Sequence, residues 1–223
     1  MKKCCILILA LSLMATTNLF AIQKYSGGTG TSSDPYQIAD KADLIELSNA
    51  SGDWHAHFEQ TADIAFSVDE TQVDWNNDGS NGGKGFSPIG NNSTNFTGSY
   101  NGQDYTIENL YINRGSTLHV GLFGVVGFVG EIRNVNLVNV EIHGKYNVGG
   151  LVGFNYAPVS NSYSSGDVSG DRKVGGLVGY NYGGGGTVSN SYSSGSVTGD
   201  QNVGGLVGGN VNSTVSNSYI TGS

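Results

Sequence analysis

Gly150-Leu151-Val152-Gly153 is one of four Gly-Leu-apolar-Gly tetrads in the second half of this chain. The tetrads share two glycines and a leucine, at Gly121, Leu122, Gly124, Gly150, Leu151, Gly153, Gly176, Leu177, Gly179, Gly205, Leu206 and Gly208. Their first glycines are 29, 26 and 29 residues apart. A repeat of this length predicts a solenoid, in which each repeat forms one coil and buries its apolar face against its neighbours.

A second landmark, Asn-Ser-Tyr, follows each of the last three tetrads. Its copies begin at Asn161, Asn190 and Asn217 and end at Tyr163, Tyr192 and Tyr219. The first two tyrosines both precede the next tetrad by 13 residues, whereas the distance from tetrad to asparagine is 11, 14 and 12 residues in turn. All variation in length therefore falls in one loop after the tetrad, as expected for a coil of fixed size with one variable loop.

The segments between the landmarks predict short strands. Val188, Asn190 and Tyr192 alternate with serines, which is the two-residue period of a strand, and the repeats show no 3.6-residue apolar period. Successive coils would pair as parallel strands about 4.8 Å apart. The predicted fold is an all-β parallel β-helix, because the blades of a β-propeller need about 40 residues or more.

Stacking of equivalent residues predicts which side chains lie inside the coils. We expect four interior columns, namely Leu137/Tyr163/Tyr192/Tyr219, Ile142/Val168/Val197, Val148/Val174/Val203 and Leu122/Leu151/Leu177/Leu206. The landmark asparagines are expected to form a ladder of side-chain amides. The tetrad glycines are expected where the chain bends sharply or where two backbones approach too closely for a side chain.

The first 120 residues differ from the repeats. Residues 1–21 predict a secretory signal peptide, with two lysines, an apolar run from Cys4 to Met14 and Ala21 before the cleavage site. Residues 22–120 predict an N-terminal cap and the first coils. Asp40 begins a capping helix that extends to Ser48, and strands are predicted within 58–66, 96–102 and 105–113. Residues 121–223 form the repeat array, which ends within a repeat, so we expect a fragment or a chain that pairs with another.

Composition restricts the function. Both cysteines, Cys4 and Cys5, lie in the signal segment, so the exported chain would have no disulfide. The net charge of −8 becomes −10 when Lys2 and Lys3 are removed with that segment. Such an acidic chain is not expected to bind nucleic acid. The rest of the chain has no apolar stretch long enough to predict a transmembrane span. The predicted location is secreted or at the bacterial cell surface.

The tetrads resemble the GLUG motif, and other segments resemble sequences that accompany it. Residues 25–38 are similar to the usual opening of GLUG proteins, and residues 86–90 with 96–98 are similar to the segment before their repeats. The resemblance implies a right-handed β-helix in a secreted or surface protein, often adhesin-like. The motif is also similar to parts of immunoglobulin A1-specific metallopeptidases outside the catalytic domain, and it transfers no catalytic residue.

Asp74, Asn76 and Asp78 are the candidates for a calcium site. Oxygen-bearing side chains at positions 1, 3 and 5, with glycine at position 6, match the start of a calcium loop, but position 12 is also glycine instead of a bidentate acid. The alternative is a polar loop whose turns use asparagine, aspartate and glycine. No other cofactor is predicted.

A second metal pattern lies earlier in the chain. His55, His57 and Glu59 would share one face of a strand, and this spacing could hold a metal ion. The alternative is a solvated strand face near the cap, since no fourth ligand is visible. A zinc peptidase is not indicated, because the chain has no His-Glu-x-x-His motif.

Glu141 and Asp167 are the candidates for enzymatic chemistry. They occupy equivalent positions in successive coils, and a β-helix lyase or hydrolase needs clustered carboxylates. We interpret them as solubilising charges, because the third copy has Ser196 and no base lies nearby. The sequence thus predicts a non-catalytic surface module that is adhesive, structural or binds an extracellular glycan or protein. The alternatives are a carbohydrate-active β-helix enzyme and a non-catalytic fragment of a large surface metallopeptidase.

Overall fold

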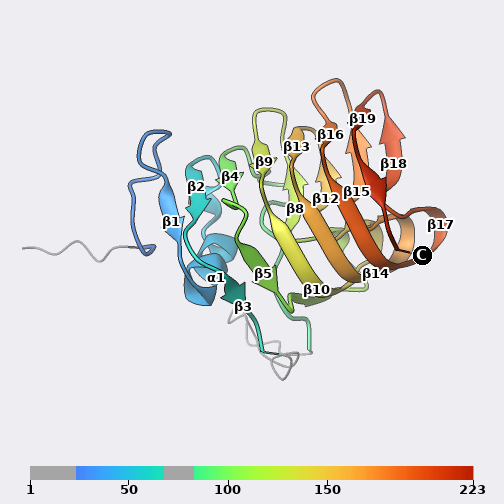
Figure 1. Ribbon diagram of the computed structural model, residues 1–223, viewed down its shortest axis with the longest axis horizontal. Helices are drawn as coiled ribbons and strands as arrows, with labels where there is room; N and C mark the ends of the chain where they lie inside the picture. Colours follow the sequence, from blue (N-terminus) through green and yellow to red (C-terminus); the bar gives the residue numbers. More distant parts are fainter. Residues whose placement is uncertain (1–23, 68–82, 223) are drawn as a thin grey trace, which may run out of the picture.

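The protein is a parallel β-solenoid. The computed structural model describes residues 24–67 and 83–222, most of which lie in strands that coil through about 4 turns (Figure 1). The predicted class, a parallel β-helix with a short N-terminal helix, is confirmed. The predicted signal peptide and the calcium candidates Asp74, Asn76 and Asp78 lie outside the described residues.

Three parallel sheets form the walls of the solenoid. Sheet 1 contains β1 (Tyr36–Ile38), β2 (His57–Gln60), β4 (Ser99–Asn101), β9 (Glu131–Arg133), β13 (Pro158–Ser160), β16 (Thr187–Ser189) and β19 (Thr214–Ser216). Sheet 2 contains β3 (Ile64–Ala65), β5 (Thr106–Glu108), β6 (Tyr111–Asn113), β7 (Leu118–Val120), β10 (Asn136–His143), β11 (Tyr146–Gly149), β14 (Tyr163–Gly175), β17 (Tyr192–Gly204) and β20 (Tyr219–Ile220). Sheet 3 contains β8 (Phe123–Val126), β12 (Val152–Asn155), β15 (Val178–Tyr182) and β18 (Val207–Val211).

The predicted capping helix is present at the N-terminal end. Helix α1 (Lys41–Asn49) begins after Asp40, whose side chain accepts a 3.0 Å hydrogen bond from the backbone N–H of Asp43. Leu44 and Leu47 are fully buried, so the helix packs its apolar face against the first coils. The short 3₁₀ helix η1 (Ser51–Asp53) follows.

The core changes in character along the solenoid. The first coils are filled by large aromatic rings, and Phe123 lies 5.0 Å from Phe96 and 5.5 Å from Tyr100 between ring centroids. All three side chains are fully buried. In the repeats the core consists instead of columns of aliphatic side chains, which follow the register predicted from the tetrads.

Three of the four predicted columns are present. Ile142 pairs with Val168 and Val168 with Val197, while Val148 pairs with Val174 and Val174 with Val203. The backbone N–H of Leu151 donates to the carbonyl of Leu177, and that of Leu177 to Leu206, and all four tetrad leucines are buried. Val203 belongs to the last described coil and is 44% exposed.

The tetrad glycines leave space for another backbone. A Cβ on Gly153 would lie 2.6 Å from the amide nitrogen of Val120, and one on Gly179 would lie 2.5 Å from the carbonyl carbon of Asn147. The second glycine of the tetrad therefore lets sheet 3 pack directly on the backbone of sheet 2. None of the eight tetrad glycines, all within the described residues, has a positive φ, so close approach is the reason for glycine here.

The predicted interior column of tyrosines is wrong. The register aligns Tyr163 with Asn136 instead of Leu137, and Tyr163 and Tyr192 are only half-buried. Tyr219, at the end of the same column, is 56% exposed. The tyrosines therefore form a column on the outside of sheet 2.

Small serines take the interior place next to these tyrosines. Leu137 pairs with Ser164, and Ser164 with Ser193, and both serines are buried. A Cβ on Gly150 would clash with the Ser164 hydroxyl, so the tetrad backbone already lies against the serine. A tyrosine would not fit at this corner, which explains why the phase of the strand is the reverse of the prediction.

The landmark asparagines adopt a left-handed backbone. Asn161, Asn190 and Asn217 have φ values of 49°, 49° and 50°, a conformation that asparagine accepts more readily than most residues. The predicted ladder among these three asparagines is wrong, because no described hydrogen bond joins their side-chain amides. The ladder instead runs from Asn161 to Asn134 (3.3 Å) and from Asn134 to Asn101 (2.8 Å). All three landmark asparagines thus share a left-handed turn conformation. The amide ladder extends from Asn161 toward the N-terminus.

Candidate binding surface

An aromatic cluster lies on the outside of sheet 3. Phe154 on β12 is stacked between His119, at 5.1 Å and 26°, and Tyr180 on β15, at 5.1 Å and 13°. Further rings come from the loops that follow the tetrads. We define the aromatic cluster as Phe128, Phe154, Tyr156, Tyr180 and Tyr182.

Two rings of the aromatic cluster are exposed to solvent and the other three are half-buried. The ring centroid of Tyr156 lies 4.5 Å from those of both Phe128 and Phe154. The ring planes of Tyr182 and Tyr156 are at 86° to each other. Phe128 is 64% exposed and Tyr182 is 37% exposed. Phe128 lies in the loop after β8 and Tyr182 ends β15, and the loops that follow these strands lie along the top of Figure 1. The cluster thus offers apolar area and tyrosine hydroxyls on adjacent coils.

A buried amide ladder fixes the backbone under these loops. Asn155 donates to Asn181 at 2.9 Å, and Asn181 donates to Asn210 at 2.8 Å. Asn155 also donates to the carbonyl of Ala157 at 2.7 Å, which holds the loop against the strand. Asn155 and Asn181 are fully buried, so each coil aligns the loop of the next.

The sequence reasoning missed this second ladder, although a signal existed. Each of the last three tetrads is followed by asparagine at a constant offset, five residues after its first glycine, at Asn155, Asn181 and Asn210. The first tetrad has Val126 at this position, so the ladder begins with the second.

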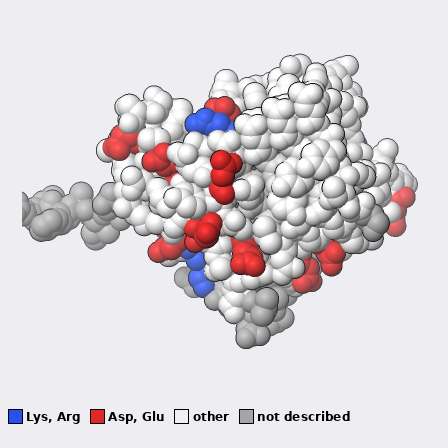
Figure 2. Space-filling view, viewed as in Figure 1, with Lys and Arg blue, Asp and Glu red and all other residues white. Residues whose placement is uncertain are grey.

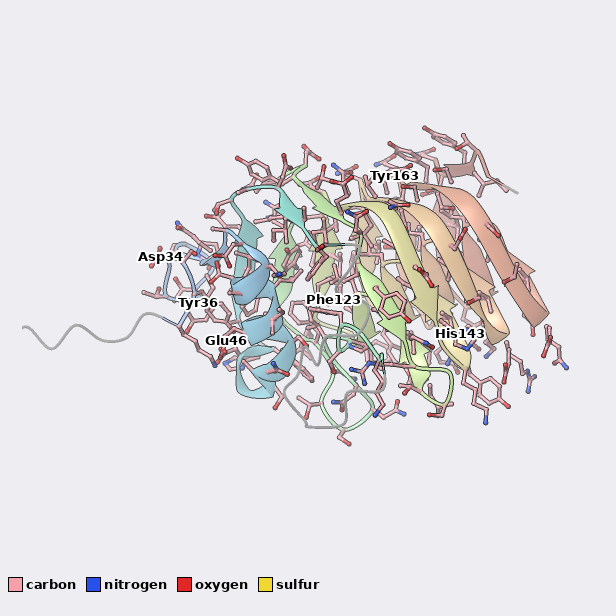
Figure 3. The ribbon with its side chains drawn as sticks, turned by 90° about the horizontal axis from the view of Figure 1, so that it is seen from below. Asp34, Tyr36, Glu46, Phe123, His143 and Tyr163 are labelled. Atoms are coloured by element: carbon pink, nitrogen blue, oxygen red, sulfur yellow. The ribbon has the colours of Figure 1, made fainter. Side chains whose placement is uncertain are left out.

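The outward tyrosines of sheet 2 form another stack. Tyr163 and Tyr192 are 4.3 Å apart at 26°, and Tyr192 and Tyr219 are 5.1 Å apart at 3°. The faces of these rings are turned toward one another, and the Tyr163 hydroxyl lies 2.7 Å from Ser194 Oγ. Figure 3 shows Tyr163 at the start of the long strands, at the opposite end from His143.

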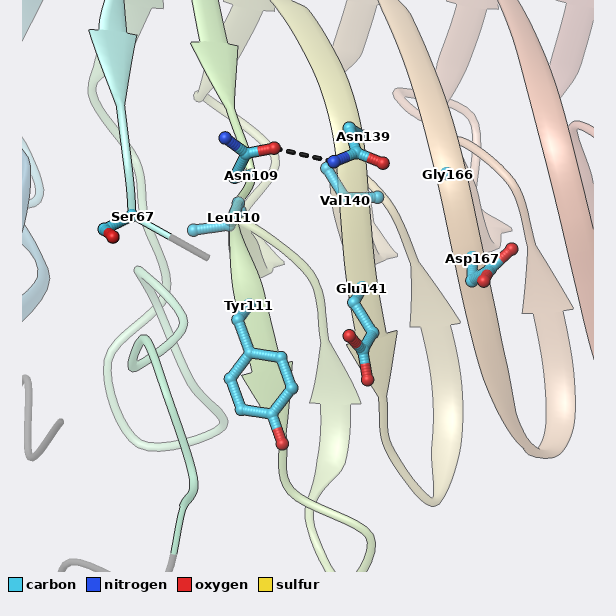
Figure 4. Close-up of a pocket in the computed structure, with 9 residues that line it drawn as sticks. All are labelled: Ser67, Asn109, Leu110, Tyr111, Asn139, Val140, Glu141, Gly166 and Asp167. Atoms are coloured by element: carbon cyan, nitrogen blue, oxygen red, sulfur yellow. Dashed lines mark hydrogen bonds between the residues drawn. The ribbon is translucent and has the colours of Figure 1, made fainter. Parts of the chain in front are cut away.

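The structure brings the two candidate carboxylates onto adjacent strands. Glu141 pairs with Asp167 on one side and Tyr111 on the other, and all three line a shallow pocket of about 180 Å³ (Figure 4). The hydrogen bond from Asn139 to Asn109, 2.6 Å long, lies above them. Both carboxylates are exposed, as the solubilising interpretation requires.

The histidine metal site does not form. His57 and Glu59 share a face of β2, but His57 Nδ1 lies 2.7 Å from Ser99 Oγ and Glu59 accepts from Gln103. His55 lies in the turn before the strand. Within residues 24–67 and 83–222, no three His, Cys, Asp or Glu side chains gather as a metal site would require.

Charge is unevenly distributed over the surface. In the face that Figure 2 shows, the C-terminal coils are largely uncharged and acidic residues follow the lower rim. The sheet 1 strands of these coils are mainly serine and threonine, as in the pairs Thr187–Thr214 and Ser189–Ser216. Among the helices of the described chain, none is long and apolar enough to cross a bilayer.

Three segments match the family model of the GLUG motif, at residues 144–169, 171–198 and 199–223. The chain therefore carries GLUG repeats, as the tetrads indicated. A crystal structure from Bacteroides ovatus, described as an immunoglobulin A1 protease, superposes with a TM-score of 0.57 over 89% of this chain and 70% of that one. Its sequence is 20% identical, so the likeness shows the fold alone.

Two curated proteins are similar over most of this chain. A segment of 150 residues, 67% of this chain, is 39% identical to halomucin from Haloquadratum walsbyi. A segment of 141 residues, 61% of this chain, is 35% identical to a protein from Evansella cellulosilytica that is named a Gly-rich membrane protein. The chain spans only 2% of the first protein and 15% of the second.

Proposed function

We propose that this chain is a non-catalytic adhesive module of a secreted or cell-surface protein, and that it binds extracellular polymers through the outside of its solenoid. The GLUG repeats and the names of the two curated relatives, halomucin and a Gly-rich membrane protein, support a surface or secreted repeat protein. Export would use residues 1–21 as a signal peptide. Residues 22–120 would then form the cap and first coils, and residues 121–223 the binding array.

The exposed aromatic cluster is the observation that carries the proposal. Exposing Phe128 and Tyr182 to water brings no benefit to the fold, because the interior columns are already filled by aliphatic side chains. Aromatic side chains supply large contact areas with little loss of conformational entropy, and they dominate many binding surfaces. Phe128 and Tyr156 lie in the loops that follow the tetrads, and Tyr182 ends the strand before such a loop, so these rings lie at the part of the repeat whose length varies.

A polymer array tests this proposal. The purified protein would be applied to printed extracellular polysaccharides and matrix proteins, together with the double variant Tyr156→Ser/Tyr182→Ser. The control is Tyr105→Ser/Tyr219→Ser, which removes two other tyrosines, 38% and 56% exposed, outside the cluster. We expect the parent and control to bind the same polymers and the cluster variant to lose them. Absence of binding to every polymer would refute the adhesive role.

A carbohydrate-active enzyme is the second candidate, because Glu141 and Asp167 lie side by side in a pocket. Carboxylates on adjacent strands are about as close together as the two catalytic carboxylates of a retaining glycosidase. Release of reducing ends from a panel of polysaccharides would be measured for the parent and Glu141→Gln. Turnover that is lost in Glu141→Gln would replace the non-catalytic proposal, whereas we expect none above background in either protein.

A further inference from the structure

Three basic side chains gather next to the aromatic cluster. Lys145 Nζ lies 5.3 Å from the ring centroid of Tyr146, and Arg172 Cζ lies 5.8 Å from the same centroid. Lys173 Nζ lies 3.2 Å from the ring centroid of Tyr180. We call Lys145, Arg172 and Lys173 the basic cluster. It adjoins the aromatic cluster directly, because Tyr180 belongs to both sets of contacts.

No carboxylate neutralises the basic cluster in the described part of the chain. The ion pairs found there join Lys24 to Glu46 and to Asp53, at the far end of the solenoid. Partial burial, and then the charge of Arg172, lower the pKa of Lys173 from its ordinary value. Arg172 and Lys173 therefore repel each other in a chain whose net charge is −8, and a bound anion would relieve that repulsion.

The basic cluster borders a shallow pocket. Tyr146, Asn147, Arg172 and Lys173 line a space of about 190 Å³. It lies at the end of the long strands where Figure 3 labels His143, since Lys145 follows that residue in the turn. An open pocket with cations at its rim and a ring in its wall suits one unit of an extended polymer.

The fold itself does not require these cations. Arg172 pairs with Gln201 in the next coil, so the position tolerates a neutral side chain. Lys173 has a left-handed backbone with φ 54°, and the equivalent turn residues Asn147 and Asn202 have φ 53° and 56°. Asparagine suits that conformation and lysine does not. A lysine at a backbone position where the equivalent turns carry asparagine indicates a role for its ammonium group.

We infer that the basic cluster, with the rings of Tyr146 and Tyr180, is a binding site for anionic carbohydrate, that is, a sugar polymer bearing carboxylate or sulfate groups. The guanidinium and ammonium groups would bind the acidic substituents through charge-assisted hydrogen bonds. The aromatic rings would pack on the apolar faces of the sugar units. This inference rests on the proposed adhesive function and names the class of its ligand.

The test uses a variant that copies the neighbouring coil. Arg172→Gln/Lys173→Asn places in this coil the pair that the next coil carries as Gln201 and Asn202, so its fold should be preserved. The control, Lys41→Gln/Lys84→Gln, lowers the net charge by the same two units elsewhere. Binding of dextran sulfate, polygalacturonate, unmodified dextran and polyphosphate would be measured for all three proteins, with thermal melting as a check of folding.

We expect the parent and the control to bind dextran sulfate and polygalacturonate but not dextran, with affinity that falls as salt is added. The basic-cluster variant should bind both anionic polymers about tenfold more weakly. Equal binding by variant and parent would overturn the inference, and so would binding of plain dextran as tightly as dextran sulfate. Polyphosphate that binds as tightly as dextran sulfate would overturn the requirement for a sugar.

Failure of this inference is distinguishable from failure of the adhesive role. If the parent binds neutral polysaccharides or proteins on the array through the aromatic cluster, the adhesive function stands and the anionic ligand class is wrong. If the parent binds no polymer of any kind, both proposals are wrong.

Discussion

Ser193 donates a 2.6 Å hydrogen bond from its hydroxyl to the backbone carbonyl of Gly205, the first residue of the next tetrad. Ser164 occupies the same position one coil earlier and is equally buried, but in the described structure its hydroxyl has no partner. The same small side chain is therefore satisfied in one coil and unsatisfied in the other, and only the hydroxyl of Ser193 is expected to stabilise the fold.

Alanine at these two positions should have opposite effects. Ser193→Ala should lower the free energy of unfolding by about 1 kcal/mol, because the Gly205 carbonyl loses its side-chain donor. Ser164→Ala should leave the free energy unchanged or raise it, because it removes a buried hydroxyl that makes no hydrogen bond. Urea unfolding of the two variants and the parent gives both values. An equal loss in both variants would show that packing, not the hydrogen bond, matters here.

The second glycine of the tetrad should not tolerate a methyl group. In Gly179→Ala the new Cβ would lie 2.5 Å from backbone atoms of Asn147 and Val148, which cannot move without separating sheets 2 and 3. We expect a loss of about 3 kcal/mol in the free energy of unfolding. Gly184→Ala is the control, since a Cβ there meets nothing within 4 Å. A control variant as unstable as Gly179→Ala would contradict the close-approach explanation.

The buried amide ladder should make its central member the most sensitive. Asn181→Ala removes the donor to Asn210 and the acceptor of Asn155, and leaves buried polar groups without partners. A loss of about 2 kcal/mol is expected. Asn210→Ala, at the exposed end of the ladder, should cost less than about 1 kcal/mol. Denaturant midpoints of the two variants provide the comparison, and a reversed order would mean that the ladder does not hold the loops.

The repeats made the coil predictable because glycine spacing fixes where backbones meet. The tetrads aligned Val148 with Val174 and Ile142 with Val168 correctly, since hydrophobic residues at a fixed offset from a corner lie inside. The tyrosine column could not be placed in the same way. A left-handed turn at Asn161 reverses which side chains face inward, and periodicity alone does not reveal a turn that interrupts a strand.

The candidate site was only partly predictable. Sequence spacing placed the variable loop after the tetrad, and Phe128 and Tyr156 lie in such loops, but the other rings of the aromatic cluster lie on strands β12 and β15. The basic cluster was not foreseen, because Lys145 and Arg172 are 27 positions apart in the sequence and reach the same Tyr146 ring only when β11 pairs with β14. Such a site depends on which residues of successive coils are paired. Sequence spacing predicts this pairing only after the residues that form the turns have been assigned.

His119 should make the protein less stable in mild acid. Burial, and then the charge of Lys173, lower the pKa of His119 from its ordinary value of 6.5. As the pH falls below about 6.5, His119 takes up a proton in the unfolded chain before it does so in the folded chain. The free energy of unfolding therefore decreases as the pH falls from the pKa of the unfolded chain to the lower pKa of the folded chain. The contribution of neutral His119 to stability is fully present above the pKa of the unfolded chain. Urea midpoints measured between about pH 7.5 and about pH 5 should therefore decrease.

The variant His119→Asn should reduce that decrease. Asparagine occupies the equivalent turn at Asn147 and Asn202 and accepts the left-handed backbone that His119 adopts with φ 58°. The variant loses the stacking on Phe154 at every pH, so its midpoint should be lower in neutral solution but should fall less in acid. His143→Gln removes an exposed imidazole and serves as the control. If His119→Asn loses as much stability in acid as the parent, protonation of His119 is not the cause, and the acid sensitivity must come from another group.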